Sequence, residues 1–200
     1  MAYSDFKTIG AIRDKFSVTV SSNTSFLFQI EEVKPNPHFY ENLQDSIKLA
    51  ININTEKARS EFLIAPVLQQ ARNLVDRQVS LFSGVEFTVD NEAGLNGYCD
   101  FILSRSTDLS FISSPVVCMV EAKNQDMTAA YPQCMAEMIA AQQFNHAQSN
   151  EIDTIWGVVT TGSIWRFLRL IDTHIEQDIS EYHINQVGKI LGILQYILKA

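Results

Sequence analysis

A chain of 200 residues is long enough for one domain of ordinary size with a substantial buried core. With 46% apolar and 19% charged residues, the composition excludes a disordered or fibrous protein. No apolar run approaches the roughly 20 residues of a membrane span, and the N-terminal residues lack the apolar core of a signal peptide. The sequence therefore predicts a cytoplasmic protein that does not contact membranes.

The net charge of −8 bears on the choice of partner. Affinity for nucleic acid comes mostly from cations that meet phosphates, so an acidic chain needs a local basic groove, a metal ion or a partner protein for such work. The three cysteines are an odd number without CxxC spacing, which favours reduced core thiols over a zinc site.

The first quarter of the chain shows no candidate chemistry. Apolar residues at helical spacing predict helices over residues 5–16 and 38–50, and an apolar run predicts a strand over residues 25–33. We therefore expect residues 1–54 to form an accessory layer that packs on the core.

A long helical pattern follows over residues 55–76. Pro66 falls inside it and should kink or split the helix. Glu61 lies near the apolar face of this helix, where a solvated carboxylate is the ordinary interpretation. Beyond the helix, residues 79–81 and 85–89 alternate as strands do.

The next two predicted strands carry charge where strands are usually apolar. Asp100 stands in the middle of the apolar run 98–103, although aspartate is depleted in strands. Residues 115–123 form a buried strand that ends in Glu121, Ala122 and Lys123. Side chains alternate along a strand, so Glu121 and Lys123 share a face. An acid and a base there cost free energy unless a metal ion and a phosphate compensate them.

The rest of the chain supplies a helix over residues 126–147, strands over 153–161 and 164–170, and a final helix over 184–198. Gln133 and Glu137 are four residues apart and share a face of the first of these helices. We interpret Glu137 as a locally paired helix carboxylate. The order of elements from residue 55 is helix, strand, strand, strand, helix, strand, which predicts an α/β fold.

Carboxylates that converge at strand ends make a hard oxygen site suited to Mg²⁺ or Mn²⁺. Such an ion polarises a phosphodiester and lowers the pKa of bound water. Lys123 can help to deprotonate the water or neutralise the phosphate, and Gln133 can position a water or a phosphate.

These residues resemble a known group. Asp100, followed after twenty residues by Glu121-Ala122-Lys123, is similar to the PD-(D/E)XK signature of the restriction-endonuclease-like superfamily, with Cys99 where the signature has proline. Glu61 and Gln133 occupy the places of frequent companions on the flanking helices. The likeness covers roughly residues 55–170 and extends to uncharacterised bacterial, largely cyanobacterial, members.

The resemblance implies a central mixed β-sheet flanked by helices in the order αβββαβ, with N-terminal and C-terminal helical additions. Residues 55–200 would be the nuclease domain, and the activity would be Mg²⁺- or Mn²⁺-dependent cleavage of DNA. Asp100 and Glu121 would bind the metal, with Glu61 as a further ligand or support. Lys123 would be the base or an electrostatic partner, and Gln133 a positioning residue.

Two other interpretations remain open. The fold could serve as a catalytically silent module for protein contacts, as a homodimer or within a larger defence or repair complex, which the negative charge favours. Alternatively, Glu121 and Lys123 could be a structural ion pair in an unrelated α/β enzyme, and Asp100 would then lie far from Glu121.

Overall fold

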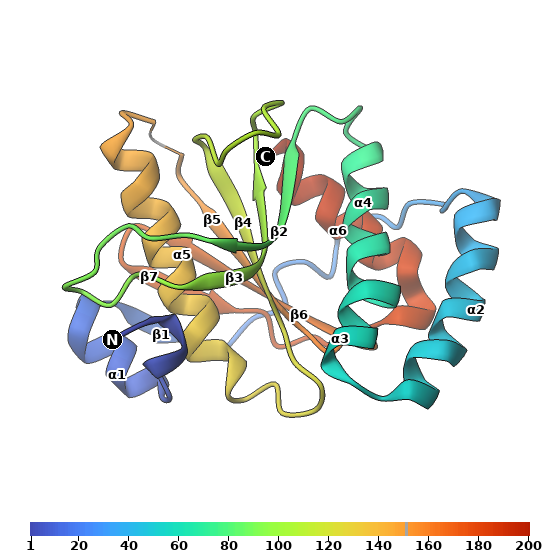
Figure 1. Ribbon diagram of the computed structural model, residues 1–200, viewed down its shortest axis with the longest axis horizontal. Helices are drawn as coiled ribbons and strands as arrows, with labels where there is room; N and C mark the ends of the chain where they lie inside the picture. The colour runs from blue at the N-terminus through green and yellow to red at the C-terminus, as the bar shows by residue number, and fades with distance from the viewer. Residues whose placement is uncertain (151) are drawn as a thin grey trace.

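An eight-stranded mixed β-sheet organises the chain in the computed structural model, which describes residues 1–150 and 152–200 (Figure 1). The strand order is β1-β7-β6-β5-β4-β3-β2, and β8 pairs with β6 beside this path. The pairs β4–β5 and β1–β7 are parallel and the others are antiparallel. The strands are β1 (Thr19–Ser21), β2 (Ser80–Glu86), β3 (Tyr98–Ser104), β4 (Val116–Ala122), β5 (Ile155–Thr160), β6 (Ile164–Ile171), β7 (His174–Gln177) and β8 (Tyr182–His183).

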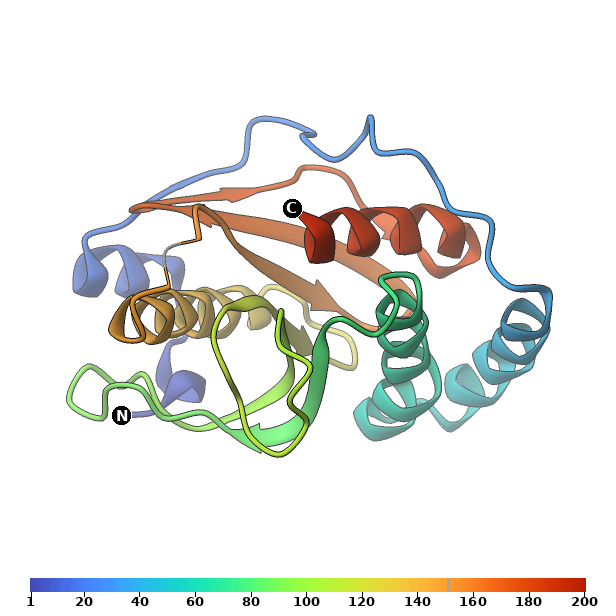
Figure 2. The same ribbon diagram turned by 90° about the horizontal axis from the view of Figure 1, so that it is seen from above.

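Helices cover both faces of this sheet (Figure 2). One face packs on α5 and α1, and the other on α4 and α6, with α2 outside α4. The helices are α1 (Ile9–Phe16), α2 (Pro37–Ile53), α3 (Glu56–Arg59), α4 (Ala65–Asn73), α5 (Ala130–Ala147) and α6 (Val187–Lys199), with short turns η1 (Tyr3–Asp5), η2 (Ser60–Ile64) and η3 (Ile184–Gln186). The predicted α/β class with a mixed, helix-flanked sheet is confirmed. No helix in the described ranges is both long and apolar enough to cross a membrane.

Strand β4 lies between the two hydrophobic layers. Every residue of β4 is buried, with Val117 and Val120 in the α4–α6 layer and Met119 in the α5 layer. This explains the unbroken apolar run in the sequence. Because β5 is parallel to β4, the chain must cross over between them, and α5 makes that crossover.

The helical pattern predicted over residues 55–76 is present as three joined segments. Helix α3 passes into the π-helical turn η2, where the Ala65 N–H donates to the Ser60 carbonyl, and α4 follows. Pro66, which has no N–H to donate, sits in the first turn of α4, where proline is tolerated. The helix therefore does not split at Pro66. Its backbone stays right-handed helical through Ile64 and Ala65, and the hydrogen bonding changes to the π-helical pattern over η2, just before the proline.

The strand predicted over residues 25–33 is wrong, because this segment contains no strand: it forms bends and turns over residues 26–30 and irregular backbone on either side. Instead of pairing with a strand, backbone N–H groups of this segment donate hydrogen bonds to other parts of the fold. The Leu27 N–H donates to the Asp178 carboxylate, and the Val33 N–H donates to the Gly188 carbonyl in α6. The N-terminal region does contribute a strand, β1, which pairs with the unpredicted strand β7 at the sheet edge.

Two glycines let this segment lie directly on α6. A Cβ at Gly192 would stand 2.1 Å from the Glu31 carbonyl oxygen, and one at Gly188 would stand 2.8 Å from that of Val33. Both distances are shorter than any side chain allows, so the contact between residues 31–33 and α6 requires glycine at these positions.

Candidate active site

Asp100 sits where the pairing between β3 and β4 ends. The regular register runs to Phe101 opposite Val120, and beyond it the Asp100 Oδ2 accepts a hydrogen bond of 2.7 Å from the Ala122 N–H. The carboxylate thus replaces a strand carbonyl as the acceptor. This contact fixes Asp100 beside the last residues of β4.

Glu121 is 0% exposed and is held by two side chains. Lys123 Nζ lies 2.5 Å from Glu121 Oε1, and Gln133 Nε2 in α5 donates to Glu121 Oε2 at 2.9 Å. The Lys123 N–H donates to the Thr160 carbonyl at the end of β5. Both oxygens of Glu121 therefore have a protein donor: Gln133 lies in α5, and Lys123 directly follows β4.

The charges at this site influence one another. The pKa of Glu121 is raised to about 7: burial is the largest cause, the Asp100 carboxylate adds to the rise, and the Lys123 ammonium opposes it. Burial lowers the pKa of Lys123, but attraction to Glu121 outweighs this and leaves that pKa raised. Lys123 is therefore a cation at neutral pH, whereas Glu121 titrates there. A further cation beside Glu121 would lower its pKa, because opposite charge favours the ionised form.

A second buried acid lies behind Glu121. Gln133 Nε2 also donates to Glu137 Oε1 at 3.1 Å, and Glu137 is 0% exposed. Burial raises the pKa of Glu137 well above its ordinary value, with Glu121 adding to the rise, so we conclude that it holds its proton. The expected local pairing of Glu137 is present, but the side chain is in the core. Its neighbours Ala136, Met138, Ala140 and Ala141 are buried too, and this run of small and apolar residues was the available signal.

Glu61 lies across a shared cavity from these residues. With Asp100 and Ala122 it lines a space of about 370 Å³, but its side chain is 55% exposed and pairs with Lys57 at 3.6 Å. Glu56, which the sequence interpretation did not single out, lines the same cavity, and its charge raises the pKa of both Glu121 and Lys123. Glu61 therefore joins the cavity without touching the hydrogen-bonded group.

The metal-binding capacity of the site rests on two carboxylates. Across residues 1–150 and 152–200, no three His, Cys, Asp or Glu side chains are grouped so as to hold a metal ion. Asp100 and Glu121 nevertheless offer hard oxygen donors side by side, and their proximity raises the pKa of Glu121. Mg²⁺ is often bound through one or two carboxylates, with waters and substrate phosphates as its other ligands. The two carboxylates of Asp100 and Glu121 therefore match the type and number of protein ligands that Mg²⁺ commonly takes.

Comparison with known proteins found no family model that matches the chain and no curated protein that matches it. The site must therefore be judged on its own geometry. The interpretation of Glu121–Lys123 as a purely structural pair expected Asp100 to lie far away, whereas Asp100 contacts the backbone of Ala122, the residue between them. That geometry does not favour the structural interpretation.

Proposed function

We propose that this protein is a Mg²⁺- or Mn²⁺-dependent DNA endonuclease with a restriction-endonuclease-like core. The observation that carries the proposal is the meeting of Asp100, Glu121, Lys123 and Gln133 at the ends of β3 and β4. Four polar residues from three elements converge where the sheet should be apolar. The order of elements from α4 to β5 is the one that the resemblance implies.

Asp100 and Glu121 would hold the ion, and Glu61 lines the cavity that Asp100 also lines. When bound, a divalent cation supplies a water of lowered pKa and polarises the phosphodiester. The Ala122 N–H fixes the orientation of Asp100, and Gln133 fixes that of Glu121. These contacts hold both carboxylates before substrate arrives.

Lys123 suits an electrostatic role better than that of a base. Its raised pKa keeps the ammonium protonated at neutral pH, so it has no free lone pair to accept a proton. A cation held by Glu121 can instead stabilise the negative charge that develops on the phosphate in the transition state.

A catalytically silent module is the second candidate. The net charge of −8 opposes DNA binding, and both oxygens of Glu121 already have protein donors. A site that is satisfied by its own side chains can stabilise the fold without any metal.

Cleavage of supercoiled plasmid with Mg²⁺ or Mn²⁺ tests the proposal. Lys123→Ala should reduce the rate by about 10²–10³, the usual cost of losing one transition-state donor. Lys48→Ala, an exposed lysine on α2, is the matched control and should cut at the wild-type rate. Equal activity in wild type and Lys123→Ala would reject the assignment. Titration calorimetry that detects neither divalent ion nor DNA at low salt would favour the silent module.

A further inference from the structure

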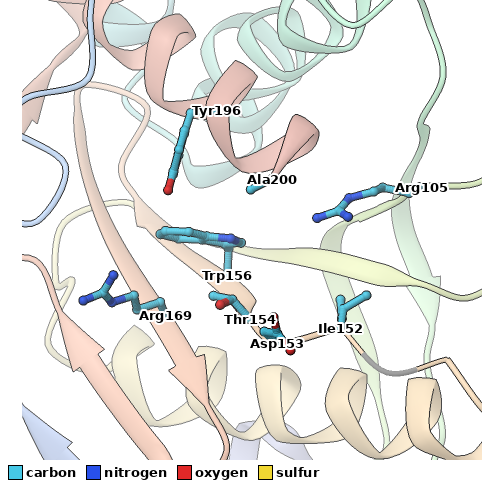
Figure 3. A pocket seen from close by; sticks show the side chains of 8 residues that line it. All are labelled: Arg105, Ile152, Asp153, Thr154, Trp156, Arg169, Tyr196 and Ala200. Carbon is cyan, nitrogen blue, oxygen red and sulfur yellow. The ribbon is translucent and has the colours of Figure 1, made fainter.

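A second cavity, of about 430 Å³, lies away from the candidate active site. Figure 3 shows its lining, which includes Arg105 just after β3 and Trp156 at the start of β5. The Arg105 N–H donates to the Pro115 carbonyl, so this cavity is near the beginning of β4, whereas Glu121 is near its end. At about 3.3 Å per strand residue, Pro115 and Glu121 are roughly 20 Å apart. We call this cavity the Arg105–Trp156 pocket.

Two buried donors at this pocket lack an acceptor among the described residues. They are the Arg105 Nε–H and the Trp156 Nε1–H, although Trp156 is only 3% exposed. The other tryptophan shows the usual arrangement: Trp165 Nε1 donates to the Gly162 carbonyl at 3.0 Å. A buried indole N–H normally finds a partner, because leaving it unpaired costs free energy. The indole nitrogen in Figure 3 is on the side of the ring nearer Arg105.

Positive charge at the pocket comes from Arg105. The other arginine, Arg169, gives Nε and Nη2 to Glu176 Oε2 and stacks 4.2 Å from the Phe26 ring centroid, so its charge is already matched. Within the described chain, no carboxylate forms an ion pair with Arg105. A half-buried guanidinium without a counter-ion is a place for an anion.

The remaining lining adds hydrogen-bonding groups rather than a stacking surface. Trp156 already packs against two aromatic rings, Phe26 at 6.3 Å and Tyr196 at 6.0 Å between ring centroids, so its contribution to a ligand is the unpaired indole N–H rather than a free ring face. Asp153 and Thr154 line the floor. A carboxylate and a hydroxyl there can accept hydrogen bonds from ligand hydroxyl groups.

We propose that the Arg105–Trp156 pocket binds a small phosphomonoester that carries hydroxyl groups, such as a mononucleotide or a sugar phosphate. The phosphate oxygens accept from Arg105 and from Trp156 Nε1, and the sugar hydroxyls donate to Asp153. The volume is within the range of small-molecule sites. The pocket is independent of the proposed nuclease activity, since it shares no residue with the site around Glu121.

Tryptophan fluorescence and titration calorimetry test this directly, with AMP, glucose 6-phosphate and inorganic phosphate as probes and adenosine as the uncharged comparison. We expect saturable one-to-one binding of a phosphomonoester and a change in emission. At 100 times the Kd, the Tm should rise by about 5–10 °C. Arg105→Gln should weaken binding at least tenfold, whereas Arg13→Gln, on the exposed face of α1, should bind as wild type does.

Trp156→Phe provides a second variant, because it removes the indole donor but keeps an aromatic ring, and calorimetry should show a weakened affinity. The proposal is overturned if none of the three phosphate probes binds saturably at 10 mM, or if Arg105→Gln and Trp156→Phe both bind as wild type does. Binding to 5′-phosphorylated oligonucleotides but to no free phosphomonoester would also overturn it, because the ligand would then be a nucleic-acid end.

Discussion

Buried polar groups at the two ends of β4 differ in whether the protein itself supplies their hydrogen-bond partners. At the end near Glu121, the carboxylates are held by donors from the protein itself: Lys123, Gln133 and the Ala122 N–H. At the end near Arg105, two buried donors have no acceptor among the described residues. The first arrangement is complete without a ligand and is positioned in advance, whereas the second gains its missing hydrogen bonds only from a ligand or water. Because the two ends share no residue, each can be perturbed separately by mutation.

The largest effect is expected from Asp100→Asn. Asparagine can still accept from the Ala122 N–H, so the fold should persist, but the negative charge that would hold a metal ion is lost. We expect metal-dependent cleavage to fall by about 100-fold or more, since such a change removes a charge that acts in the transition state. Calorimetry should show weaker Mn²⁺ binding.

Asp45→Asn, an exposed position on α2, is the control for this change. Binding to the Arg105–Trp156 pocket should be unaltered in both variants. Undiminished cleavage by Asp100→Asn would show that the pair around Glu121 is only structural.

Stability at the Glu121 end should depend on pH. Burial raises the pKa of Glu121 from 4.5 to about 7 and also raises that of Glu137, so the folded state keeps protons that the unfolded chain releases. The contribution of Glu121 is fully present below about pH 4.5 and is lost as the pH rises through about 7, and the contribution of Glu137 also falls as the pH rises. For Glu121 alone the change is on the order of 3 kcal/mol.

Urea unfolding at pH 5 and pH 8 in EDTA measures this loss. Glu137→Gln cannot ionise, so the difference between the two pH values should shrink, while Glu41→Gln, an exposed control, should behave as wild type does. A pH dependence that is the same in Glu137→Gln and wild type would mean that the folded state does not keep a proton on Glu137 that the unfolded chain releases.

Gly192→Ala should disturb the Arg105–Trp156 pocket, at the end of β4 away from Glu121. The added methyl group would collide with the Glu31 carbonyl and push residues 31–33 away from α6, at a cost of about 1–3 kcal/mol. Tyr196, one turn later, lines the Arg105–Trp156 pocket, so phosphomonoester affinity should fall while Lys123-dependent cleavage stays constant.

The control is Gly10→Ala in α1, where the nearest atom to a new Cβ is 3.8 Å away. Thermal unfolding should show no loss of stability there, because alanine favours the helix by about 1 kcal/mol. If Gly192→Ala were equally harmless, the packing of residues 31–33 against α6 would be looser than described.

Glu61→Gln should have the smallest effect. The side chain is mostly exposed and pairs only with the exposed Lys57, so the free energy of unfolding should change by less than about 0.5 kcal/mol. Cleavage should fall by less than about tenfold. A loss as large as that of Asp100→Asn would instead show that Glu61 reaches the metal in the working enzyme.

Much of the core could be predicted from residue spacing. The all-apolar run of β4 and the proline near the start of α4 are local signals, and each of these elements appears where the pattern predicts it. The meeting of Asp100 with Glu121 also has a local cause, because β3 and β4 are successive antiparallel strands. The expected set of site residues missed Glu56, the first residue of α3, which only the tertiary structure brings to the cavity lined by Asp100 and Ala122.

The sequence by itself determined the succession of core elements and the charges carried at the ends of their strands, because period and residue type are properties of neighbouring residues. Only the tertiary structure decided that residues 25–33 lie on α6 rather than pair as a strand, that β1 meets β7, and that Arg105 approaches Trp156. Those contacts join residues about 50 to 160 positions apart. Such partners are selected by packing and by the satisfaction of buried polar groups, which no local pattern records.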